Sequence, residues 1–81
     1  MAQILVVDDS QAEVDKISAI LKENGYDVVS ATSGEEGVAV AKQIKPDVVL
    51  MDIVMPGVNG FQATRQIKKD SSTGDIPVVI V

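Results

Sequence analysis

Apolar and polar positions along the chain form two alternating kinds of segment, short apolar runs and stretches of helical periodicity. Three runs rich in β-branched residues are typical of strands covered on both faces of a sheet: Ile4 to Val7, Val48 to Met51 and Ile76 to Val81. Tyr26 to Ala31 is a weaker run, and the charge of Asp27 within it favours a place at a sheet edge. The pattern therefore predicts four short strands.

Three amphipathic segments separate these strands and predict helices. They are expected between Ser10 and Asn24, between Ser33 and Lys45, and from about Gly60 to Lys69. In the first two, a serine followed three residues later by a glutamate has the spacing of a capping box. The predicted inward-facing residues are Val14, Ile17 and Leu21 with Ile20 beside them, then Val38, Ala41 and Ile44, and finally Phe61, Thr64 and Ile67.

The alternation of strands and helices predicts an α/β layer fold with a parallel sheet. If the chain steps outward from the first strand to the second and then back past the first to the third, the strand order is 2-1-3-4. Right-handed crossovers then place the first helix on one face of the sheet and the other two on the opposite face. Ligands of such sheets bind at the carboxyl ends of the strands, at the switch point between the first and third strands.

Composition narrows the classes of function. The 81 residues, 46% hydrophobic and 23% charged, suit one soluble globular domain spanning residues 1–81. The chain has no cysteine and no histidine, which excludes thiol, zinc-thiolate and imidazole chemistry. A net charge of −5 disfavours nucleic acid or an anionic membrane as partner and favours a cation or a basic partner. With no secretory signal or membrane-spanning segment in the sequence, we expect a cytoplasmic protein.

Three acidic residues follow two neighbouring strands of the predicted sheet. Asp8 and Asp9 end the first strand and Asp52 ends the third, so all three are expected at the switch point. A divalent cation would relieve their repulsion, and an all-oxygen ligand set suits Mg²⁺ or Mn²⁺. The acidic pair alone could also be a helix-start turn, and Asp52 alone could simply end a strand. Their convergence from distant parts of the sequence favours a ligand site.

The segment after Asp52 reads Ile-Val-Met-Pro-Gly-Val-Asn-Gly, from Ile53 to Gly60. With this Asp-x-x-Met-Pro-x-x-x-Gly pattern, the acidic pair and the Pro46-Asp47 lead into the third strand, the whole chain resembles the receiver domain of bacterial response regulators, of the chemotaxis type. The stretch from Val48 to Gln66 is most similar to stand-alone receivers of type IV pilus twitching-motility systems. The resemblance implies a flavodoxin-like parallel sheet with helices on both faces.

The resemblance also implies roles for individual residues. Asp52 would accept a phosphoryl group from a phosphohistidine of a partner histidine kinase, as an aspartyl phosphate. Asp9 and Asp52 would bind Mg²⁺ through their carboxylates, Asp8 mainly through water, and the backbone carbonyl of Val54 would complete the protein ligands. The metal would screen the repulsion between the attacking carboxylate and the anionic phosphoryl group.

The sequence departs from the family pattern after the fourth strand. A complete receiver has a fifth strand and two further helices, with a Ser or Thr after the fourth strand and a Lys after the fifth. Neither position lies within residues 1–81. No other base is a plausible replacement, because each lies within a predicted helix or near its carboxyl end, away from the site. We therefore expect a receiver domain that, as these 81 residues, does not switch.

Two other functions remain open. One is a non-switching interaction or assembly module on a receiver scaffold. The other is an aspartate-nucleophile phosphatase, which fits less well, because Asp8 and Asp9 are adjacent whereas such enzymes have acids two residues apart. A signalling module is thus favoured over an enzyme. Gly57 and Gly60 are interpreted as turn and helix-start glycines.

The uncharged segment Ile76 to Val81 predicts assembly. Without an outer neighbour, it offers a hydrophobic strand edge to another chain. The sheet face beside the first helix is expected to expose an apolar patch over the third and fourth strands. We therefore expect a homodimer or higher oligomer, in its simplest form a two-fold, antiparallel pairing centred on Val78 to Val81.

Overall fold

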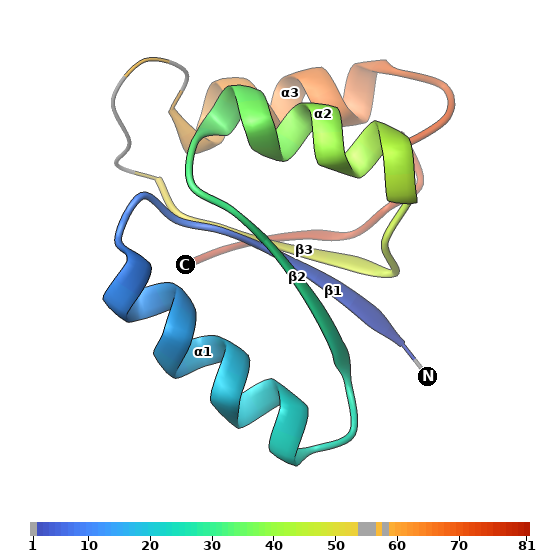
Figure 1. Cartoon of the computed structure of the whole chain (residues 1–81). Coiled ribbons are helices and arrows are strands. Elements are labelled where there is room, and N and C mark those ends of the chain that lie inside the picture. Colours follow the sequence, from blue (N-terminus) through green and yellow to red (C-terminus); the bar gives the residue numbers. More distant parts are fainter. Residues whose placement is uncertain (1, 54–56, 58) are drawn as a thin grey trace.

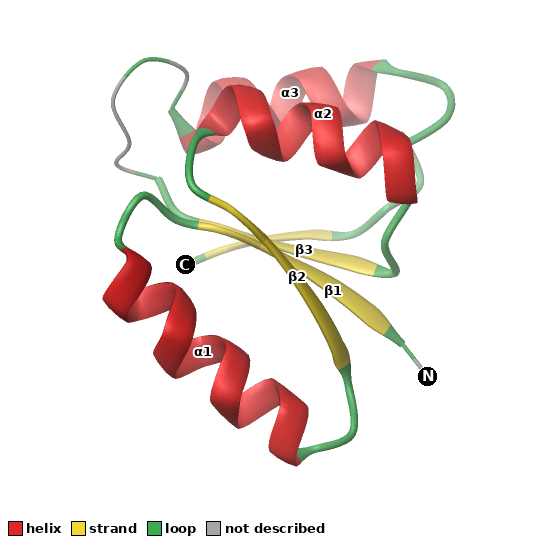
Figure 2. Cartoon of the chain, in the orientation of Figure 1, coloured by secondary structure: helices red, strands yellow, loops and turns green. Residues whose placement is uncertain are grey.

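The computed structural model describes residues 2–53, 57 and 59–81, in which strands and helices alternate along the chain (Figure 1; Figure 2). The elements are β1 (Gln3–Val7), α1 (Gln11–Glu23), β2 (Asp27–Ala31), α2 (Gly34–Ile44), β3 (Val48–Met51), α3 (Gly60–Lys69) and β4 (Val78–Ile80). The predicted α/β class is confirmed. Within the described ranges, no helix is long and apolar enough to cross a membrane.

The four strands form one parallel sheet in the order β2-β1-β3-β4, as the sequence predicts. In this register, Leu5 of β1 lies between Val29 of β2 and Val49 of β3, and Val49 in turn lies beside Val78 of β4. Helix α1 covers one face of the sheet, and α2 and α3 lie side by side on the other (Figure 1). The switch point therefore lies between β1 and β3.

Side-chain caps define the starts of α1 and α2. The Oγ atom of Ser10 accepts from the backbone N–H of Glu13 at 3.4 Å, and that of Ser33 accepts from Glu36 at 3.1 Å. The carboxylate of Glu36 accepts from the backbone N–H of Thr32 rather than from that of Ser33. The serine half of each predicted capping box thus exists and satisfies an N–H that has no partner within its helix. The reciprocal half is not formed, since the N–H of Ser10 donates to Asp8 and Glu36 accepts from Thr32.

The core is larger on the α2/α3 face of the sheet than on the α1 face. The buried residues of the α2/α3 face are Leu5, Val7, Ala31, Val38, Ala41, Val49, Met51, Ala63 and Ile67. Those of the α1 face are Ile4, Val6 and Val14, with half-buried residues such as Ile17, Leu21, Val48 and Leu50 packed around them. The sheet is therefore more completely covered on the α2/α3 side, where Val78 and Ile80 of β4 stay half-buried, than on the α1 side.

Two side chains predicted to face inward lie in solvent. Phe61 and Ile20 are each 58% exposed. In α3 the buried stripe consists of Gly60, Ala63 and Ile67, the positions i, i+3 and i+7. Because the first two of these residues are small, the helix backbone packs close to its neighbours, and Phe61, one residue out of phase, points away. The periodicity was present in the sequence, but the larger side chain was wrongly placed on the inner face.

Strand β4 is shorter and less covered than predicted. The N–H of Ile76 donates to the carbonyl oxygen of Thr73, so Ile76 belongs to the preceding turn and the strand begins at Val78. Val79 is 49% exposed and Val81 67% exposed. The run is therefore not covered on both faces, and the apolar exposure predicted for the α1 face of β4 is present.

The turn between α3 and β4 is tied down by side chains. The buried hydroxyl of Thr73 donates to the carbonyl oxygen of Ile67 at 2.6 Å. The Oδ1 atom of Asp70 accepts from both the hydroxyl and the backbone N–H of Ser72, at 2.7 and 2.8 Å. These hydrogen bonds, and to a smaller degree the ammonium of Lys42, hold the pKa of Asp70 below its usual value. The turn is therefore fixed relative to both helices of this layer.

Candidate functional site

The ends of β1 and β3 are held side by side by backbone hydrogen bonds that continue beyond the strands. The N–H of Asp8 donates to the carbonyl oxygen of Ala31 at 3.1 Å, and the N–H of Asp52 donates to that of Val7 at 2.9 Å. Asp8 and Asp52 therefore continue the ladder of the sheet by one residue each. Both side chains are therefore attached to backbone that is hydrogen-bonded to the sheet.

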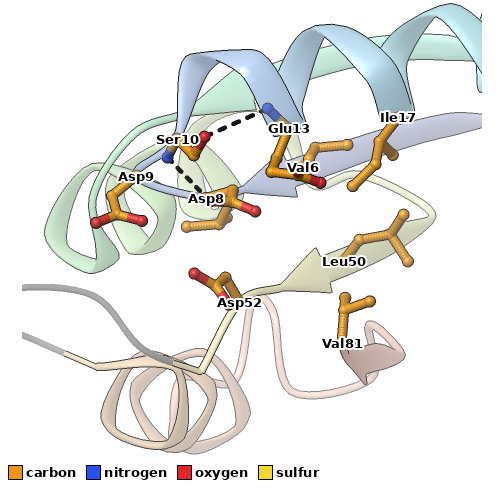
Figure 3. A pocket seen from close by; sticks show the side chains of 10 residues that line it. Val6, Asp8, Asp9, Ser10, Glu13, Ile17, Leu50, Asp52 and Val81 are labelled. Carbon is orange, nitrogen blue, oxygen red and sulfur yellow. Dashed lines mark hydrogen bonds between the residues drawn. The ribbon is translucent and has the colours of Figure 1, made fainter.

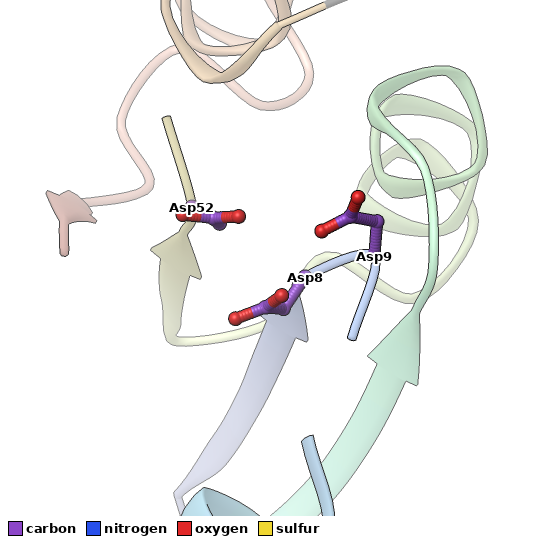
Figure 4. Close-up of side chains that lie close together, drawn as sticks. All are labelled: Asp8, Asp9 and Asp52. Carbon is purple, nitrogen blue, oxygen red and sulfur yellow. The ribbon is translucent and has the colours of Figure 1, made fainter. Parts of the chain in front are cut away.

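Three carboxylates meet at this edge of the sheet. One carboxylate oxygen from each of Asp8, Asp9 and Asp52 lies within 4.8 Å of the other two (Figure 4). Asp8 and Asp52 are half-buried, and Asp9 is exposed. Three negative charges at this separation repel one another unless a cation or a proton neutralises them. An all-carboxylate site with partial solvent access has the ligand chemistry of a Mg²⁺ site.

A cavity of about 400 Å³ opens beside the carboxylates (Figure 3). Its lining residues are Val6, Val7, Asp8, Asp9, Ser10, Glu13, Ile17, Leu50, Asp52 and Val81. It is thus acidic at the end where the carboxylates meet and apolar where α1 faces β3 and β4. Among the described residues that line it, none is a lysine or an arginine.

Glu13 is a lining residue that the sequence pattern identifies only as part of a helix cap. It lies in the first turn of α1, four residues after Asp9, and adds a fourth carboxylate to the cavity wall. The signal that could have identified it is its position, because the first turn of a helix that begins at a switch point faces the ligand.

Asp8 also has a structural role. Its Oδ1 atom accepts from the backbone N–H of Ser10 at 2.9 Å, which shapes the turn into α1 (Figure 3). The helix-start interpretation of the acidic pair therefore accounts for one oxygen of Asp8. It does not account for the approach of Asp9 and Asp52, which lie on different segments of the chain.

Two glycines shape the backbone after Asp52. Gly57 has a φ of +75°, which is the left-handed conformation expected of a turn glycine. Gly60 begins α3, and a Cβ atom built on it would lie 2.1 Å from the carbonyl oxygen of Asp52. Its N–H donates to the carbonyl oxygen of Ile53 at 3.0 Å. Val54, predicted to offer its carbonyl to a metal, lies outside the described residues, as do Met55 and Pro56.

Comparison with known proteins places this arrangement among signalling domains. Residues 4–81 match the family described as the response regulator receiver domain. The chain is 62% identical over 81 residues to protein PilH of Pseudomonas aeruginosa, covering 100% of this chain and 67% of PilH. The N-terminal domain of a response regulator receiver protein from Methanoculleus marisnigri superposes with a TM-score of 0.96 at 41% identity, over 99% of this chain and 65% of that one.

A third similar protein has a metal ion in its own structure. The receiver domain of the sensor histidine kinase PA1611 from Pseudomonas aeruginosa superposes with a TM-score of 0.93 at 30% identity. It covers 98% of this chain and 65% of its own length, and its structure has a magnesium ion coordinated in the active site cleft. The chain thus spans about two thirds of each of these three proteins.

Proposed function

Because the chain belongs to the response regulator receiver domain family, we propose that it accepts a phosphoryl group on Asp52 from a histidine kinase, with Mg²⁺ held by the neighbouring carboxylates. It would act as a receiver of a two-component phosphorelay, in chemotaxis-like or, given its similarity to PilH, twitching-motility signalling. The observation that carries this proposal is the meeting of Asp8, Asp9 and Asp52 within 4.8 Å at the switch point of the sheet.

The donor set fits the metal that the proposal requires. Asp9 and Asp52 would bind Mg²⁺ directly, Asp8 would bind it mainly through water, and the carbonyl of Val54 would complete the protein ligands. A bound ion would supply charge screening between the two anionic reactants and would hold them in line. We expect weak affinity, because Mg²⁺ retains several waters and binds few protein groups where no phosphate assists.

Asp52 would be the nucleophile of the transfer. One of its carboxylate oxygens forms a bond to phosphorus while the bond from phosphorus to the imidazole nitrogen of the kinase histidine breaks, and that nitrogen keeps the electron pair. The hydrogen bond from the N–H of Asp52 to the carbonyl oxygen of Val7 fixes the backbone that carries the nucleophile. The Asp8 carboxylate, oriented by the N–H of Ser10, stands on the neighbouring strand end.

Magnesium titration followed by backbone amide signals tests the site. We expect progressive shifts at Asp9 and Asp52 that are abolished in Asp9→Asn. The control variant Asp75→Asn removes an exposed charge from the turn before β4 and should leave them unchanged. If Mg²⁺ leaves the signals of Asp9 and Asp52 unmoved, the proposed metal site is wrong.

Intact-mass measurement with Mg²⁺ and a small phosphodonor tests the nucleophile. We expect slow gain of one phosphoryl group, absent in Asp52→Asn. It should be slow because the lysine and the hydroxyl residue of the family pattern are not among residues 1–81. Removing one such group from a site of this kind costs about 2–4 kcal/mol of transition-state stabilisation. Equal modification of Asp52→Asn would assign the nucleophile elsewhere.

A second candidate function is a non-switching interaction or assembly module. The exposed apolar side chains of Val79 and Val81 favour it, and we propose that two copies of residues 1–81, taken alone, associate through this segment. Any response to phosphorylation of these 81 residues alone should then stay local. A large phosphorylation-dependent change in partner binding by residues 1–81 would contradict the non-switching function.

A further inference from the structure

Helices α2 and α3 lie side by side and run in the same direction, so their carboxyl ends lie together (Figure 1). A groove of about 300 Å³ opens between these ends, and it is lined by Lys42 of α2 and by Gln66, Lys69 and Asp70 at the end of α3. Because the helices of such crossovers run antiparallel to the strands, this end of the molecule is opposite to the strand ends that carry the three carboxylates. The groove is therefore separate from the cavity beside Asp52.

The groove lies on the side of α3 that faces α2. Around this helix, Gln66 and Lys68 are about 200° apart. The ammonium of Lys68 donates to the carbonyl oxygen of Ile76, just before β4, so β4 and the groove lie on opposite sides of α3. In a complete receiver, a right-handed crossover from β4 to a further outer strand would run on the β4 side of α3. The exposure of the groove therefore does not depend on the segment after residue 81.

Positive charge is concentrated in the two segments that form the groove. Residues 42–45 and 65–70 contain five of the seven cationic residues of the chain and one of the twelve acidic residues. The rest of the chain contains two cationic and eleven acidic residues. The helix dipole favours lysines in the last turns of α2 and α3, which accounts for their presence at these ends. It does not account for the meeting of Lys42 and Lys69, from two different helices, at one groove.

Most of this positive charge is not balanced by a carboxylate of the chain itself. Among the described residues, Lys16 and Lys42 are the only bases that form an ion pair with a carboxylate. The ammonium of Lys42 lies 3.5 Å from Oδ2 of Asp70, and Oδ1 of Asp70 accepts two hydrogen bonds from Ser72. Both oxygens of the carboxylate that lines the groove are thus engaged. Lys69 is exposed and has no such partner within the described ranges, so the groove retains an unbalanced cation.

We propose that the groove between the carboxyl ends of α2 and α3 binds an acidic segment of a partner protein. Carboxylates of that segment would lie against the ammonium groups of Lys69 and Lys42, and the side-chain amide of Gln66 would donate to the same segment. The complementary charges would give the contact its specificity. Because the groove and the switch point of the sheet lie at opposite ends of the domain, the partner would leave the three carboxylates accessible.

The distribution of charge favours a short acidic segment over nucleic acid. Nucleic acid presents a continuous row of phosphates, and its binding depends on the neutralisation of several of them. The cationic segments are short, and the rest of the chain is strongly acidic and would repel an extended polyanion. The attraction is therefore local. Added salt should weaken it, because screening acts over about 8 Å at physiological ionic strength.

Titration with the peptide hexaglutamate, at low ionic strength and without Mg²⁺, tests the groove through backbone amide signals. We expect progressive shifts at Lys42, Gln66 and Lys69 and none at Asp9 or Asp52. Hexalysine at the same concentrations should leave the groove signals unchanged. The proposal is wrong if hexaglutamate does not move these signals, or if inorganic phosphate or a short single-stranded DNA moves them at equal or lower concentrations.

Two variants and a matched control separate the groove from the net charge of the chain. Lys69→Gln should weaken hexaglutamate binding at least about threefold, because it removes the unbalanced cation. Gln66→Lys adds a cation to the groove and should strengthen binding by about the same factor. The control Lys16→Gln removes an equal charge from an exposed position on α1 and should leave the affinity nearly unchanged. If Lys16→Gln weakens binding as much as Lys69→Gln does, the peptide responds to net charge alone and the groove is not its site.

Discussion

The α2/α3 face and the α1 face of the sheet are built from neighbouring residues of the same strands, yet they are covered to different degrees. In β3, Val49 and Met51 are completely buried under α2 and α3, whereas Val48 and Leu50 on the other side are half-buried. The residue types are equivalent, so the difference arises from the helices. Two helices cover one face, and a single helix at the β1 and β2 side covers part of the other (Figure 1).

This difference separates two tasks within a small domain. The α2/α3 face supplies most of the fixed packing that holds β1 and β3 in register, and that register places the carboxylates. The α1 face leaves room for the cavity, whose apolar wall includes Leu50 and Val81. We expect substitutions on the α2/α3 face to lower the stability of the fold. Substitutions on the α1 face should change access to the cavity with a smaller effect on stability.

The largest expected difference is between two adjacent residues of β3. Met51→Ala should lower the free energy of unfolding by about 3 kcal/mol, because it leaves a cavity in a closed core. Leu50→Ala should cost only about 1 kcal/mol, because that side chain already contacts solvent. Urea unfolding monitored by circular dichroism measures both. Equal losses would show that the α1 face is as well packed as the other.

The buried hydrogen bond of Thr73 should also contribute to the stability of the α2/α3 side. Thr73→Val should cost about 2 kcal/mol, since it removes the donor to the carbonyl of Ile67 in a buried place where the helix offers no replacement. The matched control is Thr64→Val, whose hydroxyl donates to the Gly60 carbonyl from a half-buried position inside α3. It should cost about 0.5 kcal/mol. If Thr64→Val lowers the free energy of unfolding more than Thr73→Val does, the turn between α3 and β4 does not stabilise the α2/α3 side of the sheet.

Helix caps give a smaller contrast between the layers. Ser33→Ala should lower stability by about 1 kcal/mol, because the Ser33 cap of α2 is short at 3.1 Å. Ser10→Ala should cost about 0.5 kcal/mol, because the corresponding bond of α1 is long at 3.4 Å. Both values come from shifts of the urea midpoint at constant slope. A reversed order would mean that α1 depends on its cap more than α2 does.

The smallest expected effect is a pH dependence at the turn after α3. The pKa of Asp70 is lower in the folded chain than its usual value of 3.8, chiefly through hydrogen bonds from Ser72. A lowered folded-state pKa contributes stability that is present above pH 3.8 and is lost as the pH falls through the folded-state pKa. Thermal unfolding from pH 6 to about pH 2 should therefore show a shallower decline in Asp70→Asn than in the unchanged chain. Identical profiles would contradict this contribution.

The sequence predicts most of this fold because its local signals agree. The bounds of α3 and the strand order are as predicted, and the receiver family, indicated by the segment from Asp52 to Gly60, is confirmed. The errors occur where periodicity had to be combined with side-chain size. Phe61 was placed inward with Thr64 and Ile67, although the small residues Gly60 and Ala63 determine which side of the helix packs closely.

The candidate site was predicted in part, for a related reason. Parallel strands end at one edge, so the meeting of Asp8, Asp9 and Asp52 follows from topology alone. Glu13 was missed because its spacing from Ser10 was interpreted only as part of a helix cap, although its position in the first turn of α1 places it in the cavity wall. The roles of these carboxylates in binding metal and phosphoryl groups stay predictions.

The contact between Gly60 and the Asp52 carbonyl has a mechanical consequence. A methyl group built on Gly60 would overlap that oxygen, so the first turn of α3 rests directly on the peptide that carries the carboxylate. Close-packed groups of this kind transmit displacement instead of absorbing it. A tilt of α3 would therefore shift Asp52, and a pull on Asp52 would tilt α3. Asp52 and the first turn of α3 are therefore expected to move together, because Gly60 has no side chain to separate them.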